Sequence, residues 1–211
     1  MTEETKNFDE ALKLLKAEKK RKFVQTVDLI VNLHNYDVRK EALNTFLQVP
    51  HPTEKKICAF LQKPSSVIPT VTEEGFKKYK TKKEMKNLSN EYDFFIAVAP
   101  MMSKIATKFG RVLGPTGQMP SPQAGIMPND KDETINAMVE KMKKSIRIRN
   151  KEASIKIPVG KEDMDEKFLN ENVQEILKQL ESKLPKGKEN IKDVLVKFTM
   201  SKPIKFVNNK K

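Results

Sequence analysis

The sequence predicts an α/β fold in which both ends of the chain form one domain and a small three-layer α/β unit is inserted between them. Two short apolar runs, ICAFL at 57–61 and FFIAVA at 94–99, are typical of strands buried on both faces of a parallel sheet. The N- and C-terminal portions instead show strands with one apolar face, and each supplies one amphipathic helix. Neither terminal portion could bury its core alone, so we expect the two to pair.

The N-terminal portion is predicted to be a helix followed by a strand with one open face. The helix has an apolar stripe made of Phe8, Ala11, Leu12 and Leu15. Cations at 19–22 separate this helix from a strand predicted over Phe23–Leu33. The apolar residues that alternate with polar ones in this strand are Val27, Leu29, Val31 and Leu33. A turn at 34–40, an irregular strand at 43–49 and a loop containing His51 complete the portion.

The inserted unit is expected to hold three helices beside its strands. Thr81 and Glu84 have the spacing of a capping box, which predicts that a helix begins there. A second helix is expected from Pro100 to Phe109, with Gly110 ending it at the C′ position. The third helix is amphipathic, and its apolar stripe consists of Ile135, Met138, Val139, Met142 and Ile146.

The rest of the chain is expected to be organised around the stretch Gly110–Pro128. It holds four glycines and four prolines in nineteen residues, which predicts a long shaped loop and no helix or strand. A phosphate-binding P-loop would place Lys and Ser/Thr where this chain has Gln118 and Met119, and the spacing of a dinucleotide fingerprint is also missing. A structural or RNA-contacting loop is therefore favoured over nucleotide binding.

Beyond residue 150 the pattern returns to strands that are open on one face. One is predicted around 154–157, and the last is predicted over Asp193–Ser201 with Thr199 on its open side. Between them lies an amphipathic helix that Pro185 ends. Its apolar residues are Phe168, Leu169, Val173, Ile176, Leu177, Leu180 and Leu184.

The charge balance predicts a polyanionic partner. The chain has 41 Lys and Arg against 28 Asp and Glu, a net charge of +13 and a pI of about 9.6. The single cysteine, Cys58, is expected in the core of a protein from a reducing compartment, and two histidines cannot complete an ordinary zinc site. No signal peptide and no transmembrane run are recognisable, so we expect an intracellular soluble protein without metal or cofactor.

Four separated segments resemble the ribosomal protein L-one family, a large-subunit protein of the mobile stalk beside the tRNA exit site. They are RKFVQTVDLIVNLHNYD (21–37), GRVLGPTGQMPSPQAG (110–125), SIKIPVGK (154–161) and VKFTMSKPIKF (196–206). The resemblance covers nearly the whole chain in the right order. The wording LGPTGQMPSP and TMSKP is closer to archaeal and eukaryotic members than to bacterial ones.

This resemblance implies two domains and a non-enzymatic function. Residues 1–54 plus 151–211 would form a split β-α-β domain that binds stalk ribosomal RNA. Residues 55–150 would form an inserted Rossmann-like unit without a nucleotide. The family further implies help with release of tRNA from the exit site and, in many members, translational repression through the protein's own mRNA. It also implies a monomer within the ribosome, in the cytoplasm.

Carried over by position, the primary RNA contacts lie at the start of the first long strand, in the returning strand and in the last strand. They are Lys22, Phe23, Gln25, Thr26, Lys156, Lys197, Thr199, Met200, Ser201 and Lys202. Strand parity places Phe23 and Met200 on the apolar sides of their strands, so core packing is the alternative for both. The chain departs from the family at Ser201, where glycine is usual, and at Gln25, where bacterial members often have an acidic residue.

Charge distribution alone would place the RNA site on the insert. Residues 55–150 hold 18 Lys and Arg against 9 Asp and Glu, whereas the other 115 residues hold 23 against 19. We follow the family for the primary site and assign the excess to secondary contacts, with a merely solvated surface as the alternative. These secondary contacts include the cationic stretches 77–86 and 141–149. They also include three single cations, Lys104, Lys108 and Arg111, and two glycines, Gly114 and Gly117.

Two other functions compete with a structural ribosomal protein. One is a ribosome-assembly factor with the same fold, although such factors usually carry long charged extensions that this chain lacks after Phe206. The other is a nucleotide-using α/β enzyme built around 110–128. For that enzyme we find neither a phosphate-loop spacing nor a paired acid, base or nucleophile.

Overall fold

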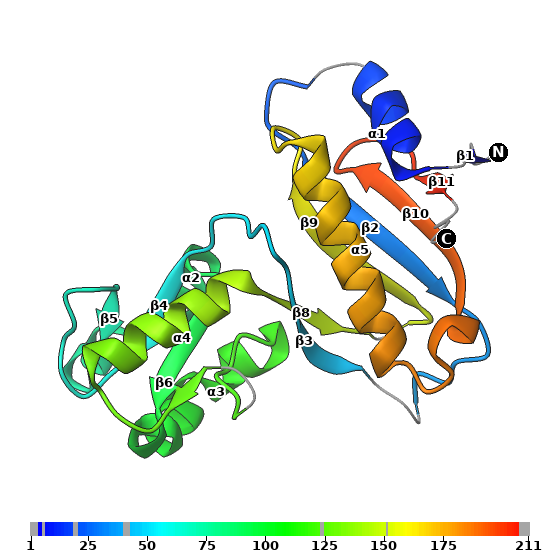
Figure 1. Cartoon of the computed structure of the whole chain (residues 1–211). Coiled ribbons are helices and arrows are strands. Elements are labelled where there is room, and N and C mark those ends of the chain that lie inside the picture. The colour runs from blue at the N-terminus through cyan, green and yellow to red at the C-terminus, as the bar shows by residue number, and fades with distance from the viewer. Residues whose placement is uncertain are drawn as a thin grey trace. The chain divides into compact units, whose positions relative to one another are not determined.

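In a computed structural model of the chain, residues 4–5, 7–18, 21–39, 43–122, 125–150 and 152–206 are described. The chain divides into two compact units, residues 1–53 with 144–211 (unit 1) and residues 54–143 (unit 2). The predicted α/β class is confirmed (Figure 1). Several positions of the expected cationic run, turn and loop lie outside the described residues, namely Lys19, Lys20, Lys40, Gln123 and Ala124.

Unit 1 is built on a five-stranded sheet that joins the two ends of the chain. Its strands, in spatial order, are β1 (Glu4–Thr5), β11 (Ile204–Phe206), β10 (Ile191–Phe198), β2 (Thr26–Leu33) and β9 (Ser154–Lys161). β2 lies between β10 and β9 and pairs antiparallel with both. Because β9 and β10 come from the C-terminal portion, the terminal portions complete one sheet, as their matching texture predicts.

Two helices bury the apolar face of this sheet. They are α1 (Phe8–Ala17) and α5 (Glu166–Lys183). The alternating residues of β2 are buried with them in one continuous core, and the residues between them face the other side. Phe168 is an exception to the predicted helix stripe, since 44% of its surface is exposed. A short 3-10 helix, η3 (Gly187–Asn190), leads into β10.

A separate two-stranded ribbon, β3 (Asn44–Gln48) with β8 (Ser145–Arg149), also belongs to unit 1. The prediction that Ile146 lies on a helix is therefore wrong. The helix α4 (Asp132–Lys144) ends one residue before β8, where Ile146 and Ile148 begin to alternate with polar residues. Both isoleucines are buried in the core of unit 1 with Leu47. Pairing with β3 thus outweighs the helical periodicity of the preceding residues.

Unit 2 contains a parallel sheet with strands in the order β5 (Thr70–Val71), β4 (Ile57–Phe60), β6 (Phe94–Val98) and β7 (Ile126–Met127). All four residues of β4 are buried, and Cys58 is a free core cysteine, as predicted. The capping box of α2 (Lys82–Glu91) is present with Thr81 and Glu84 in both directions. The remaining helices are η1 (Glu74–Lys78), η2 (Ala99–Met101) and α3 (Met102–Thr116), besides α4.

The predicted long loop at Gly110–Pro128 is wrong at its start, because α3 continues through Gly110 to Thr116, and at the short strand β7. Its buried residues Ile105, Phe109, Val112 and Leu113 hold one continuous stripe on the unit 2 core. An interior glycine costs a helix only about 1 kcal/mol, which such burial offsets. Pro115 lies in the last turn, and the helix is ended by Gly117, whose φ of 78° suits a glycine.

Two glycines should respond in opposite ways to alanine. A Cβ at Gly160 in β9 would lie 2.5 Å from Leu169 Cδ2 and 2.8 Å from Met164 Sδ, whereas a Cβ at Gly110 would have no neighbour within 4 Å. We expect Gly160→Ala to lower the free energy of unfolding by about 1–3 kcal/mol. Gly110→Ala should raise it by up to about 1 kcal/mol. Urea titration of both variants tests this, and a Gly160→Ala protein as stable as the parent would contradict it.

Candidate nucleic-acid interface

Three segments of unit 1 meet at one corner of the five-stranded sheet. Residues 22–26 lead into β2, residues 161–163 leave β9, and residues 199–202 connect β10 to β11. They meet because β2 is antiparallel to both neighbours, so that its beginning lies beside their ends, with Thr26 opposite Lys161 and Val27 opposite Phe198. We call these three segments the sheet corner.

The connection after β10 is a tight turn, and the prediction that the strand continues to Ser201 is wrong. The strand ends at Phe198, whose carbonyl oxygen accepts a hydrogen bond from the Ser201 N–H at 3.1 Å. The Phe198 N–H donates to Ser201 Oγ at 2.8 Å. The Ser201 side chain therefore closes the turn from within. This is a structural role for the residue that stands where the family usually has glycine.

Turn geometry also resolves the alternative raised by strand parity. β2 begins only at Thr26, so Phe23 precedes the strand, and Met200 lies in the turn. The exposed fractions are 53% for Phe23 and 58% for Met200. Core packing of these two residues is thus wrong, and Val24, which no pattern singled out, is exposed beside them. Large exposed apolar side chains gathered at one place mark an interaction surface.

Gln25 is a support for the corner, since only 5% of it is exposed. Its Oε1 accepts from the Met200 N–H at 3.2 Å, and its Nε2 donates to Glu162 Oε2 at 3.3 Å. Its backbone pairs with Glu162 as well, because the Glu162 N–H donates to the Gln25 carbonyl at 2.8 Å. Gln25 thereby ties all three segments of the sheet corner together.

Replacing Gln25 should loosen the corner. In Gln25→Leu the volume is kept, but the Met200 N–H loses its acceptor and Glu162 loses a donor. We expect the free energy of unfolding to fall by about 1–3 kcal/mol. Gln62→Leu, which changes an exposed glutamine of unit 2, is the control and should change stability little. Equal stabilities of the two variants in urea would show that the Gln25 contacts do not support the corner.

Thr26 and Thr199 bind each other across the end of the sheet. The Thr26 N–H donates to Thr199 Oγ1 at 3.0 Å, and the Thr199 N–H donates to the Thr26 carbonyl at 3.1 Å. The Thr199 hydroxyl oxygen is thus already an acceptor. The hydroxyl also donates a long hydrogen bond to the Thr26 carbonyl at 3.5 Å. Thr199 itself is exposed, so a ribose or phosphate oxygen could replace that weak acceptor.

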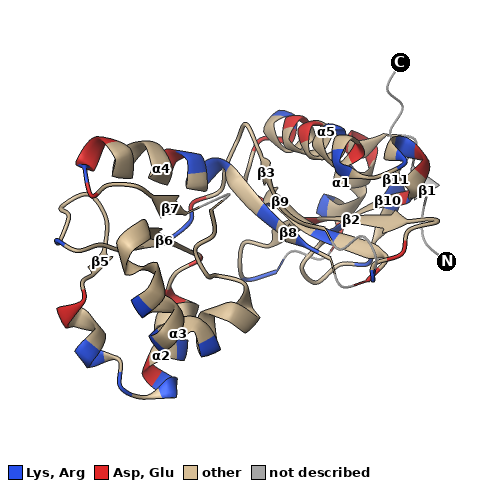
Figure 2. Ribbon diagram, turned by 90° about the horizontal axis from the view of Figure 1, so that it is seen from below, with Lys and Arg blue, Asp and Glu red and all other residues tan. Residues whose placement is uncertain are grey.

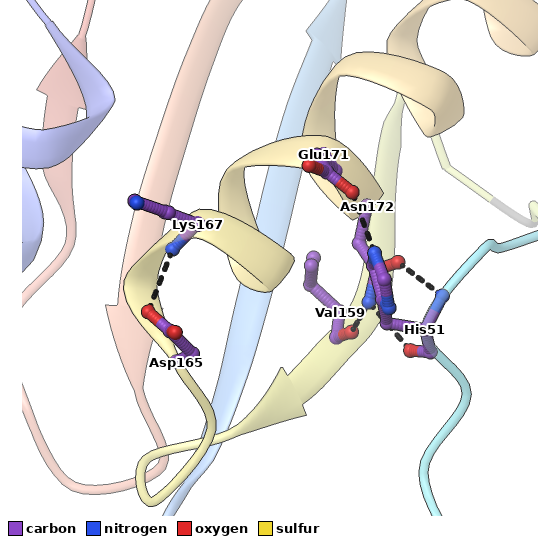
Figure 3. A network of polar contacts seen from close by, with 6 residues as sticks. All are labelled: His51, Val159, Asp165, Lys167, Glu171 and Asn172. Carbon is purple, nitrogen blue, oxygen red and sulfur yellow. Dashed lines mark hydrogen bonds and ion pairs between the residues drawn. The ribbon is translucent and has the colours of Figure 1, made fainter.

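The end of β9 is held in place by a buried asparagine of α5. The strand has a bulge there, because Val159 has no pairing partner in β2. The Val159 carbonyl accepts from Asn172 Nδ2 at 3.0 Å, and Asn172 also exchanges two hydrogen bonds with the backbone of His51 (Figure 3). The His51 ring stacks on Phe168 and lies 2.5 Å from a Glu171 carboxylate oxygen, so it is a loop brace and not a metal ligand.

Cations surround the corner unevenly. Lys22 and Lys202 are exposed there, and so is Lys161, which the sequence did not single out. Lys156 and Lys197 instead lie on the open face of the sheet. Lys156 is paired in register with Ile30, roughly 13 Å from Thr26 at about 3.3 Å per residue.

Lys197 lies on the open face of the sheet and has an acidic neighbour there. It stands opposite Asp28 in the pairing of β10 with β2. Burial raises the pKa of Asp28, and the positive charge of Lys197 opposes that rise. The sheet corner and the open face are therefore neighbouring surfaces with different roles for their lysines.

An open pocket of about 630 Å³ adjoins the exposed aromatic ring. It combines cations, apolar groups and two carboxylates, and it is lined by Lys16, Arg21, Lys22, Phe23, Val24, Glu162 and Asp163. The carboxylates of Glu162 and Asp163 make this pocket less positively charged than the net charge of the chain would suggest. Sequence reasoning missed Glu162 because its contact with Gln25 exists only once β2 and β9 are paired.

Three of the five residues of unit 2 that were carried over as secondary contacts have partners of their own or a structural role. Lys104 Nζ forms an ion pair with Glu73 at 2.6 Å, and Lys108 Nζ donates to the Phe76 carbonyl. Gly117 caps α3 and is buried. Arg111 and Gly114 are exposed on α3.

Other kinds of site are missing from the described part of the chain. It contains no group of three or more His, Cys, Asp or Glu side chains that could hold a metal ion. None of its helices is both long enough and apolar enough to cross a membrane. The sheet corner is thus our candidate for the functional site among the described residues.

Comparison with known proteins agrees with the resemblance drawn from the motifs. Residues 15–202 match the model of the ribosomal protein L1p/L10e family. The chain is 34% identical over 215 residues to the large ribosomal subunit protein uL1 of Archaeoglobus fulgidus, with 96% of each chain covered. It is 35% identical over 209 residues to the same-named protein of Thermococcus kodakarensis, with 93% of this chain and 94% of the relative covered. The uL1 of Nanoarchaeum equitans is 33% identical over 199 residues.

Proposed function

The chain belongs to the ribosomal protein L1p/L10e family, and we propose that it binds stalk ribosomal RNA through the sheet corner. It is a structural constituent of the large ribosomal subunit in the cytoplasm and not an enzyme. The nucleotide-using enzyme considered from the sequence is thereby excluded. The relatives are named as subunit proteins, which favours a resident ribosomal protein over an assembly factor.

The observation that carries this proposal is that Phe23 and Met200 are both exposed on segments of the sheet corner that also carry hydroxyl groups and lysines. RNA is recognised by stacking of unpaired bases on aromatic rings, by contacts to ribose 2′-OH groups and by cations on phosphates. The corner offers one group of each kind in Phe23, Thr199 and Lys202. Because Gln25 and Ser201 fix the two loops from inside, little conformational entropy has to be lost on binding.

We further propose that this surface serves two related tasks implied by the family. A protein that recognises an RNA by its shape also binds another RNA that presents the same shape, which would let it repress its own mRNA. From its place on the stalk it would also help release tRNA from the exit site. In both tasks the chain would act as a monomer, bound to ribosomal RNA for tRNA release and to its own mRNA for repression.

The proposal is tested by measuring binding to a stalk RNA fragment and to a scrambled RNA of equal length over a series of salt concentrations. We expect the stalk fragment to bind at least about tenfold more tightly at every salt concentration. The logarithm of affinity should fall by roughly 0.7–0.9 per neutralised phosphate for each tenfold rise in salt, hence by several units in total. Equal affinities for the two RNAs would contradict the proposal, and a flat salt dependence would remove its electrostatic part.

A further inference from the structure

A dense cluster of lysines in unit 2 has no role in the sheet corner. Six of the ten residues from 77 to 86 are lysines, and all six side chains are exposed. They lie at the end of η1, in the connection after it and in the first turns of α2 (Figure 2). We call them the lysine cluster, and they are Lys77, Lys78, Lys80, Lys82, Lys83 and Lys86.

Within the described part of the chain the members of the lysine cluster make no ion pair, whereas two lysines of α3 are held by polar partners. Lys104 is paired with Glu73 and Lys108 with a backbone carbonyl. Among the described residues, no carboxylate lies within ion-pair distance of any of the six. The positive charges of the cluster are therefore not neutralised by ion pairs within the described part of the chain.

The one acidic residue among the ten from 77 to 86, Glu84, accepts hydrogen bonds from the backbone. Glu84 Oε2 accepts from the backbone N–H groups of Lys80 and Thr81 at 2.8 and 2.9 Å, as part of the capping box. These backbone hydrogen bonds lower the pKa of Glu84, so it stays ionised and stays on the helix end. It stabilises α2, and Lys80 is the one lysine of the cluster whose charge helps to lower the pKa of Glu84.

For folding alone this arrangement is unfavourable. Lys82 and Lys83 occupy the first turn of α2, where the positive end of the helix dipole disfavours cations. Lys82 and Lys86 are four residues apart, a spacing at which like charges on a helix repel. A charge pattern that opposes the stability of its own helix indicates that another function maintains it.

We propose that the lysine cluster is a second RNA-binding surface that contacts phosphates without reading sequence. That the polyanion is RNA rests on the proposed function. That the cluster binds a polyanion rests on its charges alone. Lysine is a flexible point charge suited to phosphate contacts. The one aromatic residue among the ten, Tyr79, is half-buried and packs its ring 5.8 Å from that of Phe109, so it offers no platform for base stacking. The expected ligand is therefore the backbone of an RNA duplex.

The test compares two full-length variants with equal net charge. In the first, the six lysines of the cluster are changed to glutamine. In the second, six exposed lysines of unit 1 outside the three segments of the sheet corner are changed in the same way, namely Lys13, Lys167, Lys178, Lys186, Lys188 and Lys192. Both are titrated at low salt with a 20-base-pair RNA duplex of unrelated sequence, and their thermal unfolding is recorded.

We expect the cluster variant to bind the duplex at least about tenfold more weakly than the control variant, with a smaller salt dependence. We also expect it to melt at a higher temperature than the control, because the repulsion at the start of α2 is relieved. Equal duplex affinities of the two variants would overturn the proposal. The proposed function is judged separately, by whether the parent protein prefers stalk RNA to scrambled RNA.

Discussion

Replacing Phe23 with alanine should weaken binding to stalk RNA by roughly 5- to 150-fold. Removing an aromatic ring on which a base stacks costs about 1–3 kcal/mol of binding free energy, and 1.4 kcal/mol is a factor of ten in affinity. The free energy of unfolding should change by less than about 0.5 kcal/mol, because more than half of the Phe23 surface is exposed and the residue precedes β2. Fluorescence anisotropy with a labelled fragment measures the first effect and urea titration the second.

A matched control is available in the same unit. Phe168 is also exposed, at 44%, but it stacks on His51 and is no part of the sheet corner. Phe168→Ala should leave affinity for stalk RNA within about twofold of the parent. If Phe23→Ala and Phe168→Ala bound the fragment equally well, Phe23 would not touch the RNA.

Removing unit 2 should leave a folded protein that binds RNA, provided that the cut spares β8. We propose joining residues 1–53 to 144–211 through a short glycine-serine linker. β3 and β8 form an antiparallel ribbon whose ends are adjacent, since the Val49 N–H donates to the Lys144 carbonyl at 2.8 Å. The shortened protein keeps the whole five-stranded sheet and both helices. Its affinity for stalk RNA should fall only modestly, by the lost secondary contacts.

The position of the cut decides whether the shortened protein is stable. A junction of 1–54 with 151–211, as the sequence alone would suggest, removes β8 and with it Ile146 and Ile148. Burial of each isoleucine contributes about 1.5–3 kcal/mol, and their loss would also expose Leu47 on β3. We expect the shorter version to unfold at markedly lower urea than the version that keeps 144–150. Equal midpoints, or a well-folded longer version that bound no stalk RNA, would contradict this view of unit 1.

Periodicity predicted the elements that are half-buried and continuous in sequence. The alternation in β2 and the stripe of α5 follow from one buried face each, so local pattern and tertiary packing agree. The loop predicted at Gly110–Pro128 is wrong at its start because burial of a stripe of large apolar side chains outweighs the low helix propensity of its glycines. The stripe from Ile105 to Leu113 was visible in the sequence and would have predicted a longer helix.

At the candidate site, the sequence and its family resemblance named segments that meet in the structure, but not the roles of their residues. Parity could not show that β2 begins at Thr26 or that β10 ends at Phe198, because strand ends depend on the pairing partner. Gln25 was carried over as an RNA contact, yet its side chain is buried against Met200 and Glu162. Such contacts join residues more than 130 positions apart and leave no periodic signal.

Cross-linking tests most directly the claim that the sheet corner binds stalk RNA. The stalk fragment would carry 4-thiouridine at successive positions, and the complex would be irradiated at moderate salt and digested for mass spectrometry. We expect cross-linked peptides that contain Phe23 or Met200, two exposed apolar side chains of the corner. Cross-links found only in peptides from residues 54–143 would show instead that unit 2 holds the primary RNA site.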